Sequence, residues 1–221
     1  MKIEESLKEL KIAVENVLLA ARTDNITTLK NALALKEYSE QFGEQLGVVI
    51  FGDLNEFKNL NTNYGHEAGD AAIKAIGDMI QEKIVENLDA VGFRLGGDEF
   101  LILLAQEKLE AFNLIAPSFA KCEFDYDEKR LAAKMSFGYT VSDPKSKIDF
   151  DTLRRRAEEA CHEAKLGDGK VVEWSHDLES TQFHSIRGRR CFSCNSKIDC
   201  KIPKALEITE LINCPVCRKP L

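Results

Sequence analysis

The chain has 221 residues, of which 44% are hydrophobic and 30% charged, so it is long enough for one ordinary globular domain with a smaller attachment. No apolar run approaches the roughly 20 residues that cross a bilayer, and we expect a cytoplasmic protein without membrane contact. The formal net charge is −7, but residues 185–221 hold eight Lys and Arg against three Asp and Glu. This asymmetry predicts an acidic module followed by a small basic one.

Residues 1–22 are predicted to form an amphipathic helix, because apolar residues recur there in steps of three and four. They are Ile3, Leu7, Leu10, Val14, Val17 and Ala21. Such a heptad seam is typical of a coiled coil. Two interpretations are open: the seam forms a dimer, or the helix packs its stripe on the domain of its own chain.

The segment over 23–175 is predicted to be an α+β domain. In chain order we expect a helix from the cap-like Asp24 to Phe42, a strand over 47–55, a helix over 67–86, a hairpin of strands 90–95 and 100–105, a helix over 107–120, a strand over 131–142 and a helix over 149–165. This order favours a palm or ferredoxin-like fold, in which an antiparallel-containing central sheet carries helices on one face.

Two carboxylates are expected to meet at one edge of this sheet. Asp53 ends the strand over 47–55, and Asp98 lies at the tip of the hairpin, after a pair of glycines. Converging carboxylates beside a glycine turn suit Mg²⁺ and phosphate oxygens. Metal ions between such acids can activate a hydroxyl group and stabilise charge on a phosphorus under in-line attack. A Gly-Gly-Asp turn by itself is most often only a polar hairpin turn.

The surrounding motifs decide against that simpler interpretation. "DNITTLKNALAL" (24–35), "FGDLNEFKNLNTNYGHEAGD" (51–70), "FRLGGDEF" (93–100) and "RRRAEEACHEAKLGDGK" (154–170) resemble, in order, the motifs of the GGDEF family, the diguanylate cyclases. The resemblance covers roughly residues 22–172. It implies an enzyme that condenses two GTP into cyclic di-GMP and releases two pyrophosphates, with each subunit of a homodimer presenting one GTP to the other.

The resemblance also implies the roles of individual residues. Mg²⁺ or Mn²⁺ would be held by Asp53 and Asp98, with help from Glu99 and the backbone carbonyl of Leu54. Asp98 and Glu99 would be catalytic, and Asp98 would lie where the attacking 3′-hydroxyl loses its proton. Phosphoryl transfer asks for such a site, because it depends mainly on positioning and on neutralising charge.

Asn61 and Asp70 match the positions that hydrogen-bond guanine, with His66 close by. A carboxylate that accepts from guanine N1 and N2 finds no such donors on adenine, so Asp70 predicts base identity. The alternative is that Asn61 and Asp70 only cap a turn and a helix. The other substrate-binding residues that the resemblance implies are Phe57, Lys58, Gly97, Lys165 and Lys170. The two last would reach the terminal phosphates, whereas Lys58 is better placed to lend its backbone amide.

Some positions depart from the family pattern. Asn55 replaces the second acid of the D-x-D motif, and Gly169 replaces an expected arginine, with Lys170 one position later. Asn87 and Ala90 stand where the product-inhibition motif has Arg and Asp, so we expect no feedback inhibition there. Two alternatives therefore stay open: a catalytically weak GTP-binding or scaffold protein with a relic site, and a related palm enzyme that makes another cyclic oligonucleotide.

After a predicted linker over 176–187, residues 188–221 are predicted to form a zinc ribbon. Their C-x₂-C-x₁₉-C-x₂-C pattern supplies four thiolates at a spacing typical of structural Zn²⁺ sites, with a redox or disulfide role as the alternative. The four are Cys191, Cys194, Cys214 and Cys217. The basic charge of this module fits a protein partner or a weak contact with nucleic acid.

Overall fold

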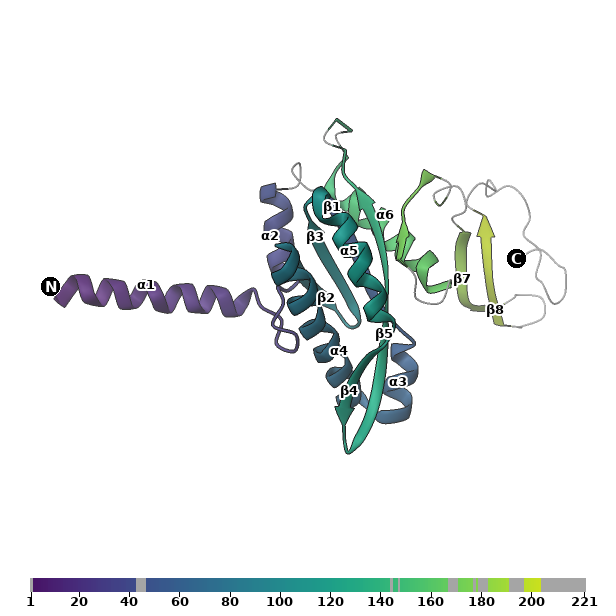
Figure 1. Cartoon of the computed structure of the whole chain (residues 1–221), viewed down its shortest axis with the longest axis horizontal. Helices are drawn as coiled ribbons and strands as arrows, with labels where there is room; N and C mark the ends of the chain where they lie inside the picture. The colour runs from purple at the N-terminus through teal and green to yellow at the C-terminus, as the bar shows by residue number, and fades with distance from the viewer. Residues whose placement is uncertain are drawn as a thin grey trace. The chain divides into compact units, whose positions relative to one another are not determined.

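The computed structural model describes two compact units, Met1–Trp174 and Ser175–Leu221 (Figure 1). The described residues are 2–42, 47–143, 145–146, 148–166, 171–176, 178, 183–190 and 197–203. Side chains are described for 5–40, 47–143, 145–146, 148–166, 171–176 and 178.

The first element, α1 (Lys2–Ala21), is a helix without Gly or Pro. Its apolar stripe is exposed, with Leu10 at 61% and Val17 at 68% of full exposure. Packing of this stripe on the domain of its own chain, one of the two interpretations, is therefore wrong for the described residues. The stripe faces solvent in the single chain.

A six-stranded sheet forms the centre of the first unit, in the order β2-β3-β1-β5-β4, with β6 paired to β5. The strands are β1 (Val48–Asn55), β2 (Val91–Gly96), β3 (Glu99–Leu104), β4 (Cys122–Tyr126), β5 (Lys129–Val141) and β6 (Val171–Glu173). Neighbouring strands run antiparallel except for the parallel β5–β6 pair. The antiparallel α+β fold predicted from the sequence is confirmed.

Helices cover both faces of this sheet, so the predicted one-sided arrangement is wrong (Figure 1). The helical elements are α2 (Ala32–Phe42), α3 (Phe57–Tyr64), α4 (His66–Ile80) with the π-helical η1 (Gln81–Glu86), η2 (Gln106–Lys108), α5 (Leu109–Ile115), η3 (Ala116–Ala120) and α6 (Phe150–Leu166). On β1, Ile50 belongs to the same core cluster as Ile76 of α4, whereas Phe51 packs with Leu153 of α6. The two-sided cover follows from β1 itself, whose unbroken apolar run needs burial on both faces.

Sequence analysis missed α3 as a separate helix and the strands β4 and β6 of the first unit. α3 is separate from α4, and β4 forms a hairpin with β5 whose turn residues Asp127 and Glu128 have φ of 46° and 59°. β4 reads Cys-Glu-Phe-Asp-Tyr, where only alternate residues are buried, so its apolar content is too low to mark it as a strand. The helix predicted over 107–120 divides into η2, α5 and η3, and Pro117 lies at the start of the last.

The second unit contains an antiparallel pair, β7 (Phe183–Arg190) and β8 (Lys197–Pro203). β7 begins inside the predicted linker over 176–187. The four cysteines predicted to bind zinc, Cys191, Cys194, Cys214 and Cys217, lie outside the described residues.

Among the described residues, no helix combines the length and the apolar character needed to cross a membrane.

Candidate functional site

Three acidic residues lie together at one edge of the sheet. Asp53 of β1 is aligned with Glu99 of β3 in the antiparallel ladder, and the Leu54 amide donates to the Asp98 carbonyl over 3.3 Å. The tip of the β2–β3 hairpin therefore lies beside the end of β1. This arrangement depends on strand pairing over some 45 residues of sequence, which is why separate motifs are needed to build it.

The hairpin turn is held by Arg94, which sequence analysis did not assign. Gly97 adopts a φ of 54°, and its carbonyl accepts hydrogen bonds from Arg94 Nε at 3.1 Å and Nη2 at 2.9 Å. Arg94 Nη1 also forms an ion pair with Asp24 at 2.9 Å, and the two side chains are only 10% and 17% exposed. The available signal was a lone arginine in the apolar strand "AVGFRL". Arg94 thus fixes the turn that presents Asp98.

The Asp24 carboxylate binds Arg94 and also accepts hydrogen bonds from the turn that follows it in the sequence. Its Oδ1 accepts hydrogen bonds from the Thr27 amide at 2.9 Å and the Thr27 hydroxyl at 2.8 Å. Burial works against ionisation, but these hydrogen bonds and the charge of Arg94 outweigh it and lower the pKa of Asp24. The carboxylate is therefore a stable anchor for Arg94.

Lys165, expected at the terminal phosphates, lies on the predicted metal ligands in this structure. Its ammonium forms an ion pair with Asp53 Oδ1 and donates a hydrogen bond to the Leu54 carbonyl over 3.3 Å. α6 positions it by packing on β1 and β5, where Cys161 Sγ donates to the Ser136 carbonyl at 3.2 Å. A cation thus already occupies the place where the acids converge.

The electrostatics of this edge are unusual for carboxylates. Burial raises the pKa of Asp53 to about 6, Lys165 opposes the shift, and the charges of Asp98 and Glu99 add to it. The pKa of Glu99 is also raised, by burial and then by the charges of Glu158 and Asp98. The edge is therefore short of positive charge even with Lys165 in place.

These residues fit a divalent metal ion. Asp53 Oδ1 is buried, and its partner in this structure is the Lys165 ammonium, so the place already holds a positive charge as a metal ligand would require. Within the described ranges no three His, Cys, Asp or Glu side chains form a ready-made metal cluster. Mg²⁺ commonly takes one or two carboxylates and completes its shell with substrate phosphates and water, and Asp53 and Glu99 supply carboxylates at this edge.

Asn55 replaces the second acid of the D-x-D motif. Its side-chain amide contacts the neighbouring strand β5. Its Oδ1 accepts a hydrogen bond from the fully buried Ser136 hydroxyl of β5 at 2.8 Å. The neutral side chain is thus engaged in the sheet, and the charge lost relative to the motif leaves Asp53, Asp98 and Glu99 in place.

The residues predicted to bind guanine lie on α3 and α4, away from strand pairing. Asn61 Oδ1 is buried without a hydrogen-bond partner, while His66 and Asp70 are exposed. A Cβ at Gly69 would lie 2.0 Å from Asn61 Oδ1, so only glycine admits the amide there. α4 begins after Gly65 without a side-chain cap, so the alternative that Asp70 caps this helix is wrong.

Phe57 and Lys58 form the first turn of α3, four and five residues after Asp53. Phe57 is partly buried against the core beneath Gly69, whereas the Lys58 side chain is exposed. Amides in the first turn of a helix have no partner within the helix, which keeps the backbone role of Lys58 open. Lys170 lies outside the described residues.

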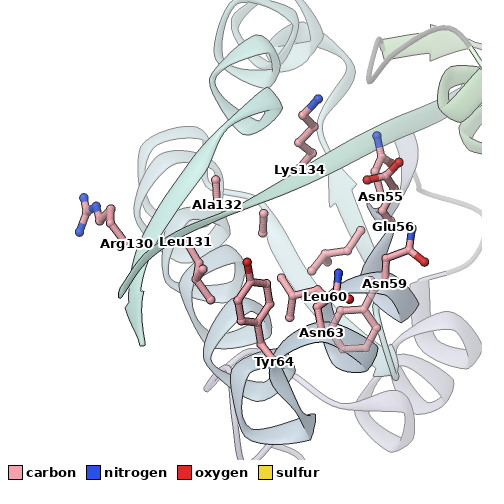
Figure 2. Close-up of a pocket in the computed structure, with 13 residues that line it drawn as sticks. Asn55, Glu56, Asn59, Leu60, Asn63, Tyr64, Arg130, Leu131, Ala132 and Lys134 are labelled. Atoms are coloured by element: carbon pink, nitrogen blue, oxygen red, sulfur yellow. The ribbon is translucent and has the colours of Figure 1, made fainter. Parts of the chain in front are cut away.

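A hollow of about 340 Å³ lies between α3 and β5. Figure 2 shows Asn59 and Asn63 of α3 facing it from one side, with Leu131 and Lys134 of β5 on the other. It shares Leu54 with the acidic edge. Its lining includes Phe57, a predicted substrate-binding residue, but none of the predicted acids or guanine-binding residues, so the hollow adjoins the predicted nucleotide site.

Comparison with known proteins agrees with the motifs. The family model for the diguanylate cyclase GGDEF domain matches residues 21–170. Diguanylate cyclase TpbB of Pseudomonas aeruginosa is 39% identical over 198 residues, covering 78% of this chain and 44% of that protein. Cyclic di-GMP phosphodiesterase PdeR of Escherichia coli is 27% identical over 215 residues, covering 93% of this chain and 30% of that protein.

The chain spans less than half the length of these curated relatives. Among solved structures, the coiled coil and GGDEF domain of DgcB from Caulobacter crescentus, in complex with c-di-GMP, superposes with a TM-score of 0.64 at 20% identity. The match covers 78% of this chain and 95% of that one, and at this identity it supports the fold. From the family match and the order of its motifs, the chain belongs to the GGDEF diguanylate cyclase domain family.

Proposed function

We propose that this protein is a diguanylate cyclase, which joins two GTP into cyclic di-GMP and releases two pyrophosphates. The observation that carries the proposal is the acidic edge, where Asp53, Asp98 and Glu99 come together and the buried Oδ1 of Asp53 is paired with the Lys165 ammonium. Nucleotidyl transfer needs such a place, because the attacking hydroxyl and the phosphate charge must be held together.

Asp98 is assigned the proton of the attacking 3′-hydroxyl, and Glu99 supports the same edge. Asp53 and the Leu54 carbonyl would hold Mg²⁺ or Mn²⁺ together with Asp98 and Glu99. The bound metal ion would supply charge neutralisation at the phosphates. The Arg94 contact to Gly97 keeps Asp98 in position while the substrate binds.

Guanine recognition is assigned to Asn61 and Asp70, with His66 beside them. Asn61 Oδ1 has no hydrogen-bond donor in this structure and can accept a hydrogen bond from the base. The exposed Asp70 carboxylate can accept hydrogen bonds from guanine N1 and N2. Phe57, Lys58, Gly97, Lys165 and Lys170 are assigned to the remaining contacts with GTP. The backbone amides of Phe57 and Lys58, at the start of α3, suit phosphate oxygens.

Each chain would act on one GTP and face a second chain, because cyclic di-GMP has two equivalent bonds to form. The exposed stripe of α1 supports a homodimer through a parallel coiled coil. Substitution of Leu10 and Val14 by Glu is expected to turn a dimer into a monomer in analytical ultracentrifugation. A dimer that survives both changes would place the interface elsewhere.

The zinc ribbon over 188–221 remains part of the proposal on sequence grounds alone. Metal analysis of the purified chain by mass spectrometry should find one Zn²⁺ per chain, lost when Cys191 and Cys214 are both replaced by Ser. Zinc below one tenth of the chain concentration in the wild type would remove this part of the proposal.

The experiment for the main proposal incubates the protein with Mg²⁺ and each of the four nucleoside triphosphates, singly and mixed, and resolves the products by mass spectrometry. Cyclic di-GMP from GTP alone is the expected result. An adenine-containing product would favour a different palm enzyme. No product at concentrations where the protein is dimeric would favour a GTP-binding protein with a relic site.

A further inference from the structure

Lys165 lies on the two atoms that the proposed function gives to the metal ion. Its ammonium pairs with Asp53 Oδ1 and donates to the Leu54 carbonyl at 3.3 Å. We propose that Lys165 is the resident counter-ion of this site, which a divalent cation displaces and thereby frees to bind the triphosphate. The inference rests on the proposed function and adds to it a coupling between metal binding and phosphate binding.

The site needs a cation when no metal ion is bound. Asp53 Oδ1 is buried, and the rest of the protein gives it no hydrogen bond of good geometry. Asp98 and Glu99 stand at the same edge and add negative charge. A buried carboxylate is costly unless it is paired, so the ammonium of Lys165 is the compensation that the fold provides.

Lys165 is also able to leave. It occupies the last turn of α6, and its side chain is 30% exposed. A lysine is a point charge on a flexible stem, so it can swing away without a change in the helix. A divalent ion brings twice the charge to the same oxygens and repels the ammonium at short range. The displaced ammonium then lies next to the phosphates that the metal ion holds.

This arrangement makes metal and nucleotide binding cooperative. Without nucleotide, the metal ion must break the Lys165–Asp53 ion pair, and the ammonium gains no new partner. With nucleotide, the triphosphate supplies one. Coupling of this kind is reciprocal, so the nucleotide strengthens metal binding by the same factor as the metal strengthens nucleotide binding.

The first test measures Mn²⁺ binding by electron paramagnetic resonance of the free ion, for wild type and for Lys165→Met. Without nucleotide the variant is expected to bind Mn²⁺ about tenfold more tightly, equivalent to about 1.4 kcal/mol. Lys74→Met, which removes a lysine from the exposed Lys74–Asp78 pair on α4, is the control and should leave Mn²⁺ affinity unchanged. Unchanged or weaker Mn²⁺ binding by Lys165→Met would overturn the inference.

The second test repeats the titration with 3′-deoxy-GTP, which lacks the attacking hydroxyl and forms no product. The analogue should strengthen Mn²⁺ binding to the wild type about tenfold, and this gain should shrink to about twofold in Lys165→Met. An equal gain in both proteins would show that Lys165 does not carry the coupling.

A third test uses the wild type, so it does not depend on folding of the variant. Lys165 acetylation by an amine-reactive reagent, followed by mass spectrometry of its peptide, should accelerate when Mn²⁺ is added and slow again when 3′-deoxy-GTP follows. A rate indifferent to Mn²⁺ would contradict displacement. The assays with metal ion alone do not depend on turnover. If the protein makes no cyclic di-GMP, the proposed function fails, and the Mn²⁺ measurements still decide whether Lys165 is displaced.

Discussion

The acidic edge of the sheet and the α3–α4 segment are built in opposite ways. At the acidic edge, Asp53 and Glu99 are brought together by strand pairing, and the side chain of Asp53 is only 21% exposed. Asn61 and Asp70 lie nine positions apart on the consecutive helices α3 and α4, and Asp70 is exposed. The first region is crowded with charge, whereas the second is open to a ligand. We infer a division of labour between chemistry at the edge and base recognition on the helices.

A large effect is expected for base identity. Asp70→Ala should reduce the preference for GTP over ATP from about 10⁴-fold to about 10²-fold, because the acceptor for guanine N1 and N2 is lost. The ratio of product formation rates from the two nucleotides measures this. An unchanged ratio would mean that Asp70 on α4 does not recognise the base.

The pH dependence of stability tests the charge at the acidic edge. Asp53 has a pKa of about 6 in the fold against an ordinary value of 3.8. The unfolded chain therefore releases this proton first as pH rises, so ionisation of Asp53 costs stability from about pH 4 upward and the full cost is reached above the folded pKa. In metal-free buffer, Asp53→Asn should gain up to about 3 kcal/mol on the wild type between pH 4 and pH 7.

Urea denaturation at several pH values checks this expectation. The interaction with Lys165 is already contained in the pKa of Asp53, so any other effect of the Asp53→Asn substitution shifts its stability by a constant amount. The slope with pH is therefore the relevant quantity. A wild-type-minus-variant difference that stays flat from pH 4 to pH 7 would mean that Asp53 titrates at its ordinary value.

Arg94 tests whether the acidic edge depends on its support. Arg94→Met should lower the free energy of unfolding by about 2 kcal/mol, because Asp24 and the Gly97 carbonyl both lose a largely buried partner. Arg130→Met on the exposed β4–β5 hairpin, where Arg130 is 57% exposed, should cost far less than Arg94→Met. Equal costs in urea denaturation would contradict the role given to Arg94.

Gly69→Ala gives the smallest expected effect and tests whether Asn61 on α3 contributes to GTP binding. The added methyl group would displace the Asn61 amide, which ends a side chain and can move, so the fold should survive. GTP affinity, measured by calorimetry with Mg²⁺, should fall about tenfold, equivalent to about 1.4 kcal/mol. Thr62→Ala on the exposed side of α3 is the control, and an equal loss there would discredit the Asn61 contact.

The local parts of this site could be predicted from the sequence, and the long-range contacts could not. The segment from Phe57 to Asp70 is continuous, so its motif carries its own geometry. The approach of Asp53 to Asp98 also followed, because the order of strands implies one shared edge. The Arg94–Asp24 pair spans 70 residues and the Lys165 contact to Leu54 spans 111, and no local pattern reports such contacts.

The helices on the second face were missed for a related reason. The apolar run from Val48 to Phe51 is buried on both sides, but periodicity alone does not separate a strand covered twice from one covered once by large side chains. Lys165 likewise has a contact in the site that the sequence pattern does not report. The motif places a lysine near phosphates, while its resting partner depends on where α6 ends relative to β1.

The division of labour is tested most directly by Asp98→Asn, with product formation and GTP binding measured on the same sample. Asp98→Asn keeps the shape of the side chain and removes the carboxylate that is assigned to accept the proton of the 3′-hydroxyl. Cyclic di-GMP formation should fall by about 10²–10³-fold, while GTP affinity measured with Mg²⁺ should fall by less than about tenfold, or about 1.4 kcal/mol, because Asp53, Glu99 and the Leu54 carbonyl would still hold the metal ion. Product formation at the wild-type rate, or a loss of GTP binding as large as the loss of product, would contradict the account.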